Sequence, residues 1–389
     1  MLVLATASAL SYLAQAYRER SHWLVWLKRD STMERDSKRR EVPAARPRRR
    51  TAGVTTRYLR VAVPLLLLAG IQLDGARLDV PELTLTPDRA TRLLVIAPHP
   101  DDEALGAAGL IQRVRANGGP VRVVLLTSGD GFPEGVEAAH GIARPKPSDF
   151  RGYGVLRERE TLTALEGLGV SPARVSFLGF PDEGLCRLAS TYLYDKRRSF
   201  ESPYTSREKP PATEQLVRGV KYRGVDVRRE LEQIVEGFAP TLIALPHPED
   251  DHPDHCSAHI FAREALLAVA PAIRARVRVL HYLVHYDQWP LTPDGGIGTT
   301  LNPPEGFPAS EGRWASLSLT EQEAAAKKRA LLAYNSQMQV IGRFMLAFGR
   351  SNELFLEGEP ASLPECWCDG ENVATEVPPA RYRRWPPKR

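Results

Sequence analysis

The chain has 389 residues, of which 43% are hydrophobic and 25% charged, a composition typical of a globular protein large enough to bury a core. Its formal net charge of +5 comes from residues 1–60, which hold 14 Lys/Arg against 5 Asp/Glu, so the rest of the chain is slightly acidic, which argues against a nucleic-acid-binding groove. Four scattered cysteines are too few for a disulfide scaffold, and we interpret them as ordinary thiols.

The first 82 residues form a basic leader that differs from the rest of the chain. Within it, residues 61–73 form an apolar run behind Arg57 and Arg60. This run is shorter than the ~20 residues of a membrane span but suits the apolar region of a signal peptide, so it predicts export or a membrane anchor. The alternative is a disordered basic leader followed by a buried apolar strand or helix, in which case we expect a cytoplasmic protein.

Strand and helix patterns alternate through a predicted body at residues 83–360, which a Pro/Arg-rich tail follows at 361–389. Short apolar runs predict strands, and segments with helical periodicity between them predict helices. The predicted strands lie at 92–97, 121–127, 175–179, 241–245 and 277–284. The predicted helices lie at 103–116, 156–168, 225–238 and 254–269, with a further helical stretch at 319–348. This alternation indicates an α/β protein with a Rossmann-like, doubly wound, mostly parallel sheet.

Two long stretches, residues 129–153 and 187–224, interrupt the alternation and are predicted to be irregular. Loops of this length are uncommon in compact domains unless they are functional or mobile. We therefore expect both of them to wall the substrate site.

Two motifs rich in His and Asp directly follow predicted strands. Residues 98–103 (Pro-His-Pro-Asp-Asp-Glu) follow the first strand, and residues 247–255 (His-Pro-Glu-Asp-Asp-His-Pro-Asp-His) follow the fourth. Ligands of open α/β sheets bind at the carboxyl edge, beside the switch in strand order. If the strands adopt the order 3-2-1-4-5, the two motifs meet in one crevice.

The residue types in these motifs suit a hydrolytic metal site. Catalytic zinc takes three protein ligands from His and carboxylate side chains and keeps one position for water. His99 and Asp102 stand three positions apart in one turn, and His255 would complete the set, which leaves Asp101 free to act as a base. Helix capping by acidic residues is the alternative, and we favour it for Asp254 taken alone, but capping does not explain two His/Asp clusters. Iron or cobalt would suit the same ligands.

These motifs resemble the signature of the LmbE-like, or PIG-L, family of zinc-dependent N-deacetylases. The family's first motif usually begins with Ala, where this chain has Pro98, and its closing His-Pro-Asp-His stands at 252–255. The similarity extends from residue 92 to about residue 355. It implies a three-layer α/β/α fold with long loops around the site, one Zn²⁺ per chain bound by His99, Asp102 and His255, and Asp101 as the general base.

The resemblance also implies roles for residues outside the metal set. His252 would stabilise the oxyanion or protonate the leaving amine, oriented by Asp254, while Arg157 and Asp182 would contact the substrate. For Arg157 the alternative is an exposed ion pair with neighbouring Glu residues on its helix. From its place after the last predicted strand, His285 is a further candidate for the pocket, or else an ordinary strand-end residue.

The leading hypothesis is a metal-dependent hydrolase, an N-deacetylase that removes the N-acetyl or another N-acyl group from an amino sugar or glycoconjugate. One alternative is a non-catalytic, metal-containing module that binds a glycan or a lipid headgroup. Another is a metallohydrolase that acts on an ester, a phosphoester or a non-sugar amide. We expect an N-acetylated sugar or glycoconjugate as the partner, no nucleic acid, and membrane association only through residues 61–73.

Overall fold

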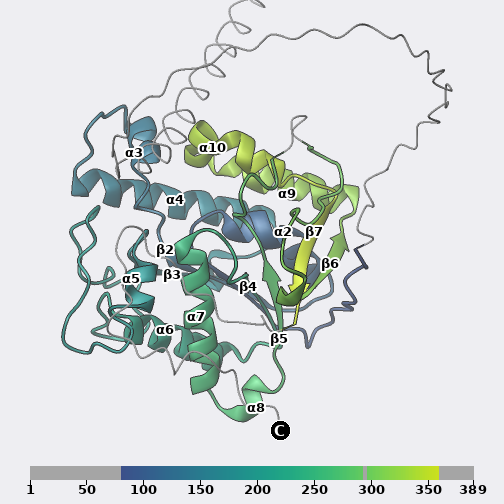
Figure 1. Ribbon diagram of the computed structural model, residues 1–389, viewed down its shortest axis with the longest axis horizontal. Helices are drawn as coiled ribbons and strands as arrows, with labels where there is room; N and C mark the ends of the chain where they lie inside the picture. The colour runs from purple at the N-terminus through teal and green to yellow at the C-terminus, as the bar shows by residue number, and fades with distance from the viewer. Residues whose placement is uncertain (1–79, 292–295, 359–389) are drawn as a thin grey trace, which may run out of the picture. The chain divides into compact units, whose positions relative to one another are not determined.

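A seven-stranded sheet forms the centre of the protein (Figure 1). The computed structural model describes residues 80–291 and 296–358, and the strands named here belong to those ranges. The sheet order is β3-β2-β1-β4-β5-β7-β6, with β1 to β5 parallel and with β7 antiparallel to both β5 and β6. The strands are β1 (Leu93–Ala97), β2 (Val121–Thr127), β3 (Val175–Phe180), β4 (Leu242–Pro246), β5 (Arg278–Tyr282), β6 (Arg313–Ser318) and β7 (Asn352–Glu357).

Helices cover both faces of this sheet and make a three-layer α/β/α architecture. Every residue of β1 is buried, because alternate side chains enter two separate hydrophobic cores: Leu93 and Val95 enter one, and Leu94 and Ile96 enter the other. The first core is covered by α2 (Asp102–Ala116), α4 (Pro147–Gly167), α9 (Glu321–Ala333) and α10 (Asn335–Ala347). The second is covered by α5 (Leu185–Ala189), α6 (Gly224–Phe238) and α7 (Pro253–Ala268).

The strand order confirms the predicted doubly wound sheet and the neighbouring positions of β1 and β4. Val95 of β1 stands beside Val123 of β2 on one side and beside Ala244 of β4 on the other. The chain crosses from β1 toward β3 in one direction and from β4 toward β5 in the other, so the switch in strand order lies between β1 and β4. Both His/Asp motifs leave the sheet at this point.

The stretch at 129–153, predicted to be irregular, is partly helical, so that prediction was wrong. It contains α3 (Pro133–His140) and the first turns of α4, whose start at Pro147 precedes the predicted start by nine residues. Proline at the first helical position favours both starts, and the Lys146 N–H donates to the Asp149 carboxylate at 2.8 Å. A small hydrophobic cluster of Val136, Phe150 and Tyr153 then packs the two helices together.

The helical stretch predicted at 319–348 is two helices, α9 and α10, that meet at Tyr334. This residue has non-helical backbone angles (φ −80°, ψ 64°), and its buried hydroxyl donates to the carboxylate of Glu103 in α2. Two strands that the sequence patterns did not reveal, β6 and β7, flank these helices and extend the sheet beyond β5. The strand predicted to end at residue 284 ends at Tyr282.

The stretch predicted to be irregular at 187–224 contains no helix or strand at residues 190–223, but its ends are helical, because α5 continues to Ala189 and α6 begins at Gly224. The remaining short elements are α8 (Pro271–Arg274) and the 3₁₀ turns Pro172–Arg174 and Ala309–Glu311.

Cys186 and Cys256 are disulfide-bonded, which corrects their interpretation as ordinary thiols. The prediction failed because the spacing of cysteines along a chain does not reveal which of them meet in space.

None of the helices in the described ranges is both long and apolar enough to span a lipid bilayer. The basic leader with its apolar run at 61–73 and the tail at 361–389 fall outside the described residues. Their predicted roles therefore stay predictions.

Candidate metal centre and catalytic site

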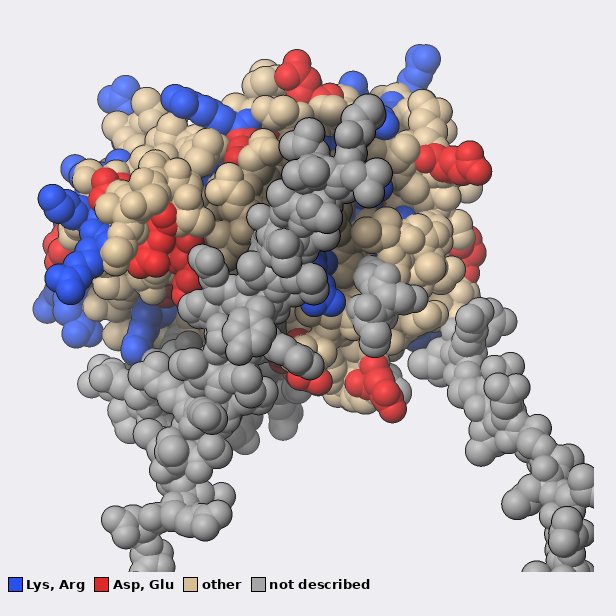
Figure 2. All heavy atoms as spheres, turned by 90° about the horizontal axis from the view of Figure 1, so that it is seen from above, with Lys and Arg blue, Asp and Glu red and all other residues tan. Residues whose placement is uncertain are grey.

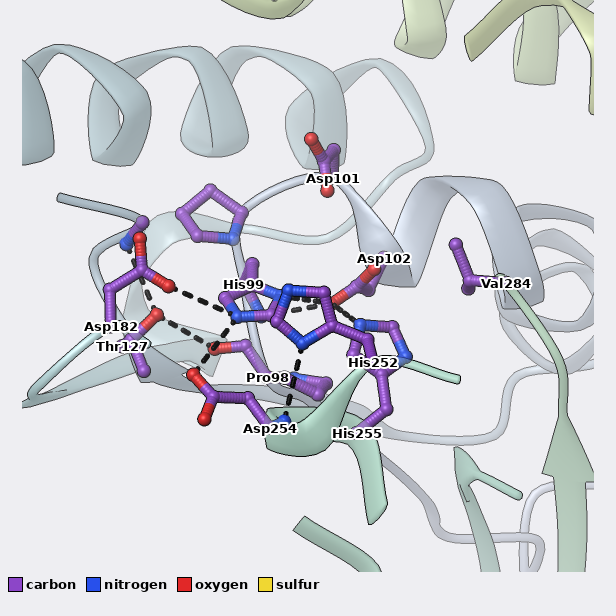
Figure 3. A network of polar contacts seen from close by, with 12 residues as sticks. Pro98, His99, Asp101, Asp102, Thr127, Asp182, His252, Asp254, His255 and Val284 are labelled. Atoms are coloured by element: carbon purple, nitrogen blue, oxygen red, sulfur yellow. Dashed lines mark hydrogen bonds and ion pairs between the residues drawn. The ribbon is translucent and has the colours of Figure 1, made fainter. Parts of the chain in front are cut away.

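The two His/Asp motifs meet at the carboxyl edge of β1 and β4 (Figure 3). His99 follows β1, Asp102 opens α2, and His255 stands in the first turn of α7. All three side chains are buried, with His255 completely inaccessible. The structure thus brings together the three residues predicted to bind a metal.

One carboxylate oxygen joins the two imidazole rings. Asp102 Oδ2 lies 3.3 Å from His99 Nδ1 and 3.2 Å from His255 Nε2. Ligand atoms ~2.0–2.1 Å from a single tetrahedral ion are separated by about 3.4 Å, so these separations fit a shared zinc-like ion. Although both nitrogens of His255 lie 3.2 Å from carboxylate oxygens, neither makes a hydrogen bond with any group in the described ranges. The donor set therefore fits a cation better than a hydrogen-bonded network.

Each imidazole has a second carboxylate on its far side. His99 Nε2 lies 3.1 Å from Asp182 Oδ1 and 3.4 Å from Asp254 Oδ2, and Figure 3 shows His99 between this pair and Asp102. His255 Nδ1 lies 3.2 Å from Asp250 Oδ2. Metal-bound histidines usually turn their other nitrogen to such a carboxylate, which fixes the tautomer and the ring orientation.

Sequence reasoning missed Asp250, although it stands inside the second motif. Its carboxylate accepts the backbone N–H groups of Val284 and His285 at 2.8 and 3.0 Å, so it ties the segment after β5 to the site. Burial raises the pKa of Asp250, but the nearby His255 and these N–H groups outweigh burial and lower it to about 2. Its position five residues before His255 was the available signal.

The charge of this cluster also favours a bound cation. Burial lowers the pKa of His255, but the charges of Asp102 and Asp250 outweigh burial and raise that pKa to about 10. The carboxylates therefore produce a negative potential in a buried site, which a bound metal ion would neutralise. Within the described ranges, three groups of side chains have metal-ligand spacing: His99–His252–His255, Asp102–His255–His285 and His99–Asp182–Asp254. Each includes one or two of the predicted ligands His99, Asp102 and His255, and none includes all three.

Asp101 lies beside the predicted metal ligands in an unusual backbone conformation, with φ 121° at the N-terminus of α2. It is 5% exposed; burial raises its pKa to about 7, while the charge of Arg157 opposes that rise. Arg157 Nη2 donates to Asp101 Oδ2 at 3.1 Å and to the carbonyl of Pro100 at 2.7 Å, and Nη1 donates to the carbonyl of Gly129 at 2.8 Å. Arg157 is therefore buried against Asp101, which rules out the exposed ion pair considered as its alternative.

His252 stands at the more open side of the cluster, with its side chain 22% exposed. Its Nδ1 accepts the backbone N–H of Asp254 at 3.2 Å, so the proton of a neutral ring sits on Nε2. That Nε2 lies 3.3 Å from Glu183 Oε1. Glu183 follows Asp182 directly and adopts the left-handed backbone region at φ 58°, which is uncommon for a residue with a side chain.

The remaining predicted site residues also lie in this cluster. The Asp254 carboxylate accepts the backbone N–H of Glu183 at 2.8 Å and faces His99, so Asp254 holds His252 through its backbone rather than through its side chain. The His285 ring lies 4.9 Å from the ring of His255 and stacks on Phe344 at 5.3 Å. Burial lowers the pKa of His285 to about 3, so this ring is neutral at physiological pH.

Comparison with known proteins gives matches over the same part of the chain. Residues 94–266 match the family described as PIG-L, GlcNAc-PI de-N-acetylase. The chain is 32% identical over 182 residues to a 1D-myo-inositol 2-acetamido-2-deoxy-alpha-D-glucopyranoside deacetylase of Nocardia farcinica, covering 46% of this chain and 52% of that protein. It is 28% identical to the deacetylase of the same name from Salinispora arenicola, covering 66% of this chain and 79% of that protein.

A relative with a different printed substrate matches as well. The chain is 26% identical to a diacetylchitobiose deacetylase of Thermococcus kodakarensis, covering 45% of this chain and 49% of that protein. In the Nocardia and Thermococcus comparisons, the chain thus spans about half the length of the curated relative.

Proposed function

We propose that this chain, whose residues 94–266 match the PIG-L family, is a member of that family and a metal-dependent N-deacetylase of an amino sugar. One observation carries the proposal: Asp102 Oδ2 joins the imidazoles of His99 and His255 at 3.3 and 3.2 Å, with the Asp101 carboxylate beside them. The names of the relatives share an N-acetylated sugar, so we propose an N-acetylglucosamine unit as the group that is hydrolysed.

His99, Asp102 and His255 would hold the metal, for which the His and carboxylate donor set suits zinc. When bound, such an ion polarises an amide carbonyl and lowers the pKa of water toward about 7. Asp182 and Asp250 keep the two imidazoles in the orientation that directs one nitrogen of each ring at Asp102.

The remaining residues would move protons. Asp101 accepts the proton of the water that attacks the amide carbon, and Arg157 holds its carboxylate in place. His252 Nε2, which carries the ring proton, donates to the oxyanion or to the leaving nitrogen. The C–N bond breaks, and acetate and a free amine leave.

Two variants of the full-length protein separate metal binding from proton transfer. We expect His255→Ala to lose both the bound metal and acetate release, because one of the three proposed ligands is gone. Asp101→Asn should keep the metal and lower kcat by about 10²–10⁴-fold, the usual contribution of a general base. Metal content by mass spectrometry and acetate release from N-acetylglucosamine derivatives provide the two measurements.

His140→Ala is the matched control, because His140 is exposed at the end of α3. Loading the metal-free protein separately with zinc, iron and cobalt would identify the active ion. Acetate release that persists after complete metal removal would contradict the mechanism. A metal-loaded protein that binds N-acetylated sugars without hydrolysing them would instead support the non-catalytic alternative.

A further inference from the structure

The junction between α9 and α10 places three polar side chains inside the protein. Tyr334 is completely buried, and Ser336 and Gln337 are each 2% exposed. Figure 2 shows the face of the protein on which Figure 1 places α10, and Lys, Arg, Asp and Glu side chains stand out from this face. The three side chains of the junction instead need partners in the interior, because a buried polar group without a hydrogen bond destabilises the fold. Their partners lie in α2 and α4.

The partner in α2 is Glu103, two residues after the proposed general base Asp101. The Tyr334 hydroxyl donates to Glu103 Oε1, and the side chain of Thr161 in α4 contacts the same hydroxyl. Glu103 Oε2 accepts the backbone N–H of Asp101 at 3.2 Å. The Glu103 side chain is completely buried. Two hydrogen bonds therefore connect Tyr334 to the backbone of Asp101.

Asp101 has a backbone conformation that the surrounding structure must hold. Its φ of 121° lies in a region that L-amino acids rarely adopt, and such conformations persist only where neighbouring contacts fix them. Its side chain makes no capping hydrogen bond to α2 within the described ranges, so the carboxylate does not itself fix the start of the helix. The hydrogen bond from the Asp101 N–H to Glu103 is therefore one of the contacts that hold this strained residue.

The partners in α4 lie on either side of Arg157. The Ser336 N–H and hydroxyl donate to the two carboxyl oxygens of Glu160 at 2.9 and 2.6 Å. Gln337 Nε2 donates to the Tyr153 hydroxyl at 2.7 Å. Residues spaced four and then three apart share one face of a helix, so Tyr153, Arg157 and Glu160 face the same side of α4. The junction therefore fixes the face of α4 that presents Arg157.

One junction thus supports Asp101 through its N–H and through its carboxylate. The N–H is linked to Tyr334 by Glu103, and the carboxylate accepts Arg157 Nη2 at 3.1 Å from the helix that the junction also contacts. We propose that Tyr334 is a positioning residue of the reaction: acting through Glu103, it keeps the Asp101 carboxylate where it can accept a proton from the attacking water. The proposal rests on the proposed role of Asp101 as general base. A displacement of about 1 Å can lower a rate about 10²-fold, so a hydroxyl that touches no reacting group can affect kcat.

Tyr334→Phe removes this hydroxyl and keeps the ring in the first hydrophobic core. For acetate release from N-acetylglucosamine derivatives by the metal-loaded, full-length protein, we expect kcat to fall about tenfold while KM and the metal content stay within about twofold of the parental values. The reason is that Asp101 would take part in proton transfer and in neither metal binding nor substrate binding. Tyr194→Phe removes the same atom from a side chain that is 57% exposed and should behave as the parent. An unchanged kcat, or a loss of metal in Tyr334→Phe, would overturn the proposal.

Amide hydrogen exchange tests the same contact without any acetate release. In Tyr334→Phe, exchange in the segment 99–105 should become at least about fivefold faster, because the Asp101 N–H donates to a carboxyl group that has lost its other partner. Exchange in β2 should not change, and Tyr194→Phe should change neither segment. Equal acceleration of both segments, or no change in segment 99–105, would overturn the positioning role. If the parent releases no acetate, the proposed function fails, and exchange alone decides whether Tyr334 holds Asp101.

Ser336→Ala provides a second variant in case Tyr334→Phe does not fold. It removes one hydroxyl from the contact with Glu160 and leaves the backbone N–H of residue 336 in place. We expect a smaller fall in kcat, about threefold, with KM and metal content as in the parent. Ser171→Ala, at an exposed position, is the matched control. Equal kcat values in these two serine variants would contradict the role of the junction.

Discussion

At the scale of single residues, the site depends on carboxylates that contact the two histidines. We expect these carboxylates to orient the imidazole rings and not to contact the reacting groups themselves. Asp182 and Asp254 share His99 Nε2, while Asp250 alone faces His255 Nδ1. The two imidazoles are therefore supported unequally. His99 keeps one partner if the other is removed, whereas His255 has no second carboxylate among the described residues within ion-pair distance of Nδ1.

We expect Asp250→Asn to weaken metal binding about 10–100-fold, because a neutral amide no longer raises the basicity of His255 as the carboxylate does. The protein should still fold, since an Asn side-chain oxygen can accept the N–H groups of Val284 and His285. Competition with a chelator measures the affinity. Asp251→Asn, at the exposed neighbouring position, is the control, and equal affinities in the two variants would contradict this role.

At the scale of secondary-structure elements, α4 positions the ends of two strands. Arg157 in α4 donates to the carbonyl of Pro100 after β1 and to the carbonyl of Gly129 after β2, and the same guanidinium reaches Asp101. Gly129 adopts φ 65°, and a Cβ atom there would stand 2.1 Å from Arg157 Nη1. One helix therefore sets where the loops after β1 and β2 lie relative to each other.

Arg157→Lys should lower kcat by at least about tenfold while the metal content stays at the parental level. A single ammonium group cannot reproduce the three contacts of the guanidinium fork, so the Asp101 carboxylate is no longer held. Parallel kinetic and metal analyses check both parts. Arg159→Lys, at an exposed position of the same helix, should leave both unchanged. Loss of metal in Arg157→Lys would instead indicate a role in the architecture of the metal site.

At the scale of the whole molecule, buried histidines link folding to pH. His247, His259 and His281 pack around one another, with ring centroids 5.4 and 5.2 Å from that of His281. Burial lowers the pKa of His247 to about 4 and that of His259 to about 3, and it also holds the pKa of His281 well below its usual range. Nδ1 of His259 and of His281 is buried without a hydrogen-bond partner in the described ranges.

The folded protein should lose stability as the pH falls below about 6.5. A histidine whose pKa is lowered in the folded state binds fewer protons when the protein is folded than when it is unfolded. Its contribution to the free energy of unfolding is therefore complete above the unfolded-state pKa, and it is lost as the pH falls toward the folded-state pKa. For His259, which faces His247, His281 and Arg263, the loss between pH 7 and pH 5 is about 2 kcal/mol. The stability difference between these pH values, measured by urea unfolding, should shrink in His259→Gln. His140→Gln should leave it unchanged, and an unchanged difference in His259→Gln would refute the linkage.

The sequence alone determined the order of strands and helices around the site. A short apolar run before each His/Asp motif predicted β1 and β4, because a strand buried on both faces needs apolar residues throughout. The alternation of strands and helices predicted the parallel, doubly wound arrangement, because parallel strands require crossover connections. These local sequence patterns were sufficient to predict that His99, Asp102 and His255 lie at the carboxyl edge of the sheet. The chemical roles of the three residues stay predictions.

Only the tertiary structure decided features that depend on contacts between distant segments. Residues 133–140 and 147–153 are helical because Val136, Phe150 and Tyr153 pack together. Helix α9 ends at Ala333, just before Tyr334, whose hydroxyl donates to Glu103. Two further contacts depend on how the chain folds as a whole: the Asp250 carboxylate lies beside His255, and Arg157 is buried against Asp101. No local sequence pattern predicts either contact. Periodicity and capping signals extend over a few turns, whereas a contact across the sheet edge depends on the packing of the whole body.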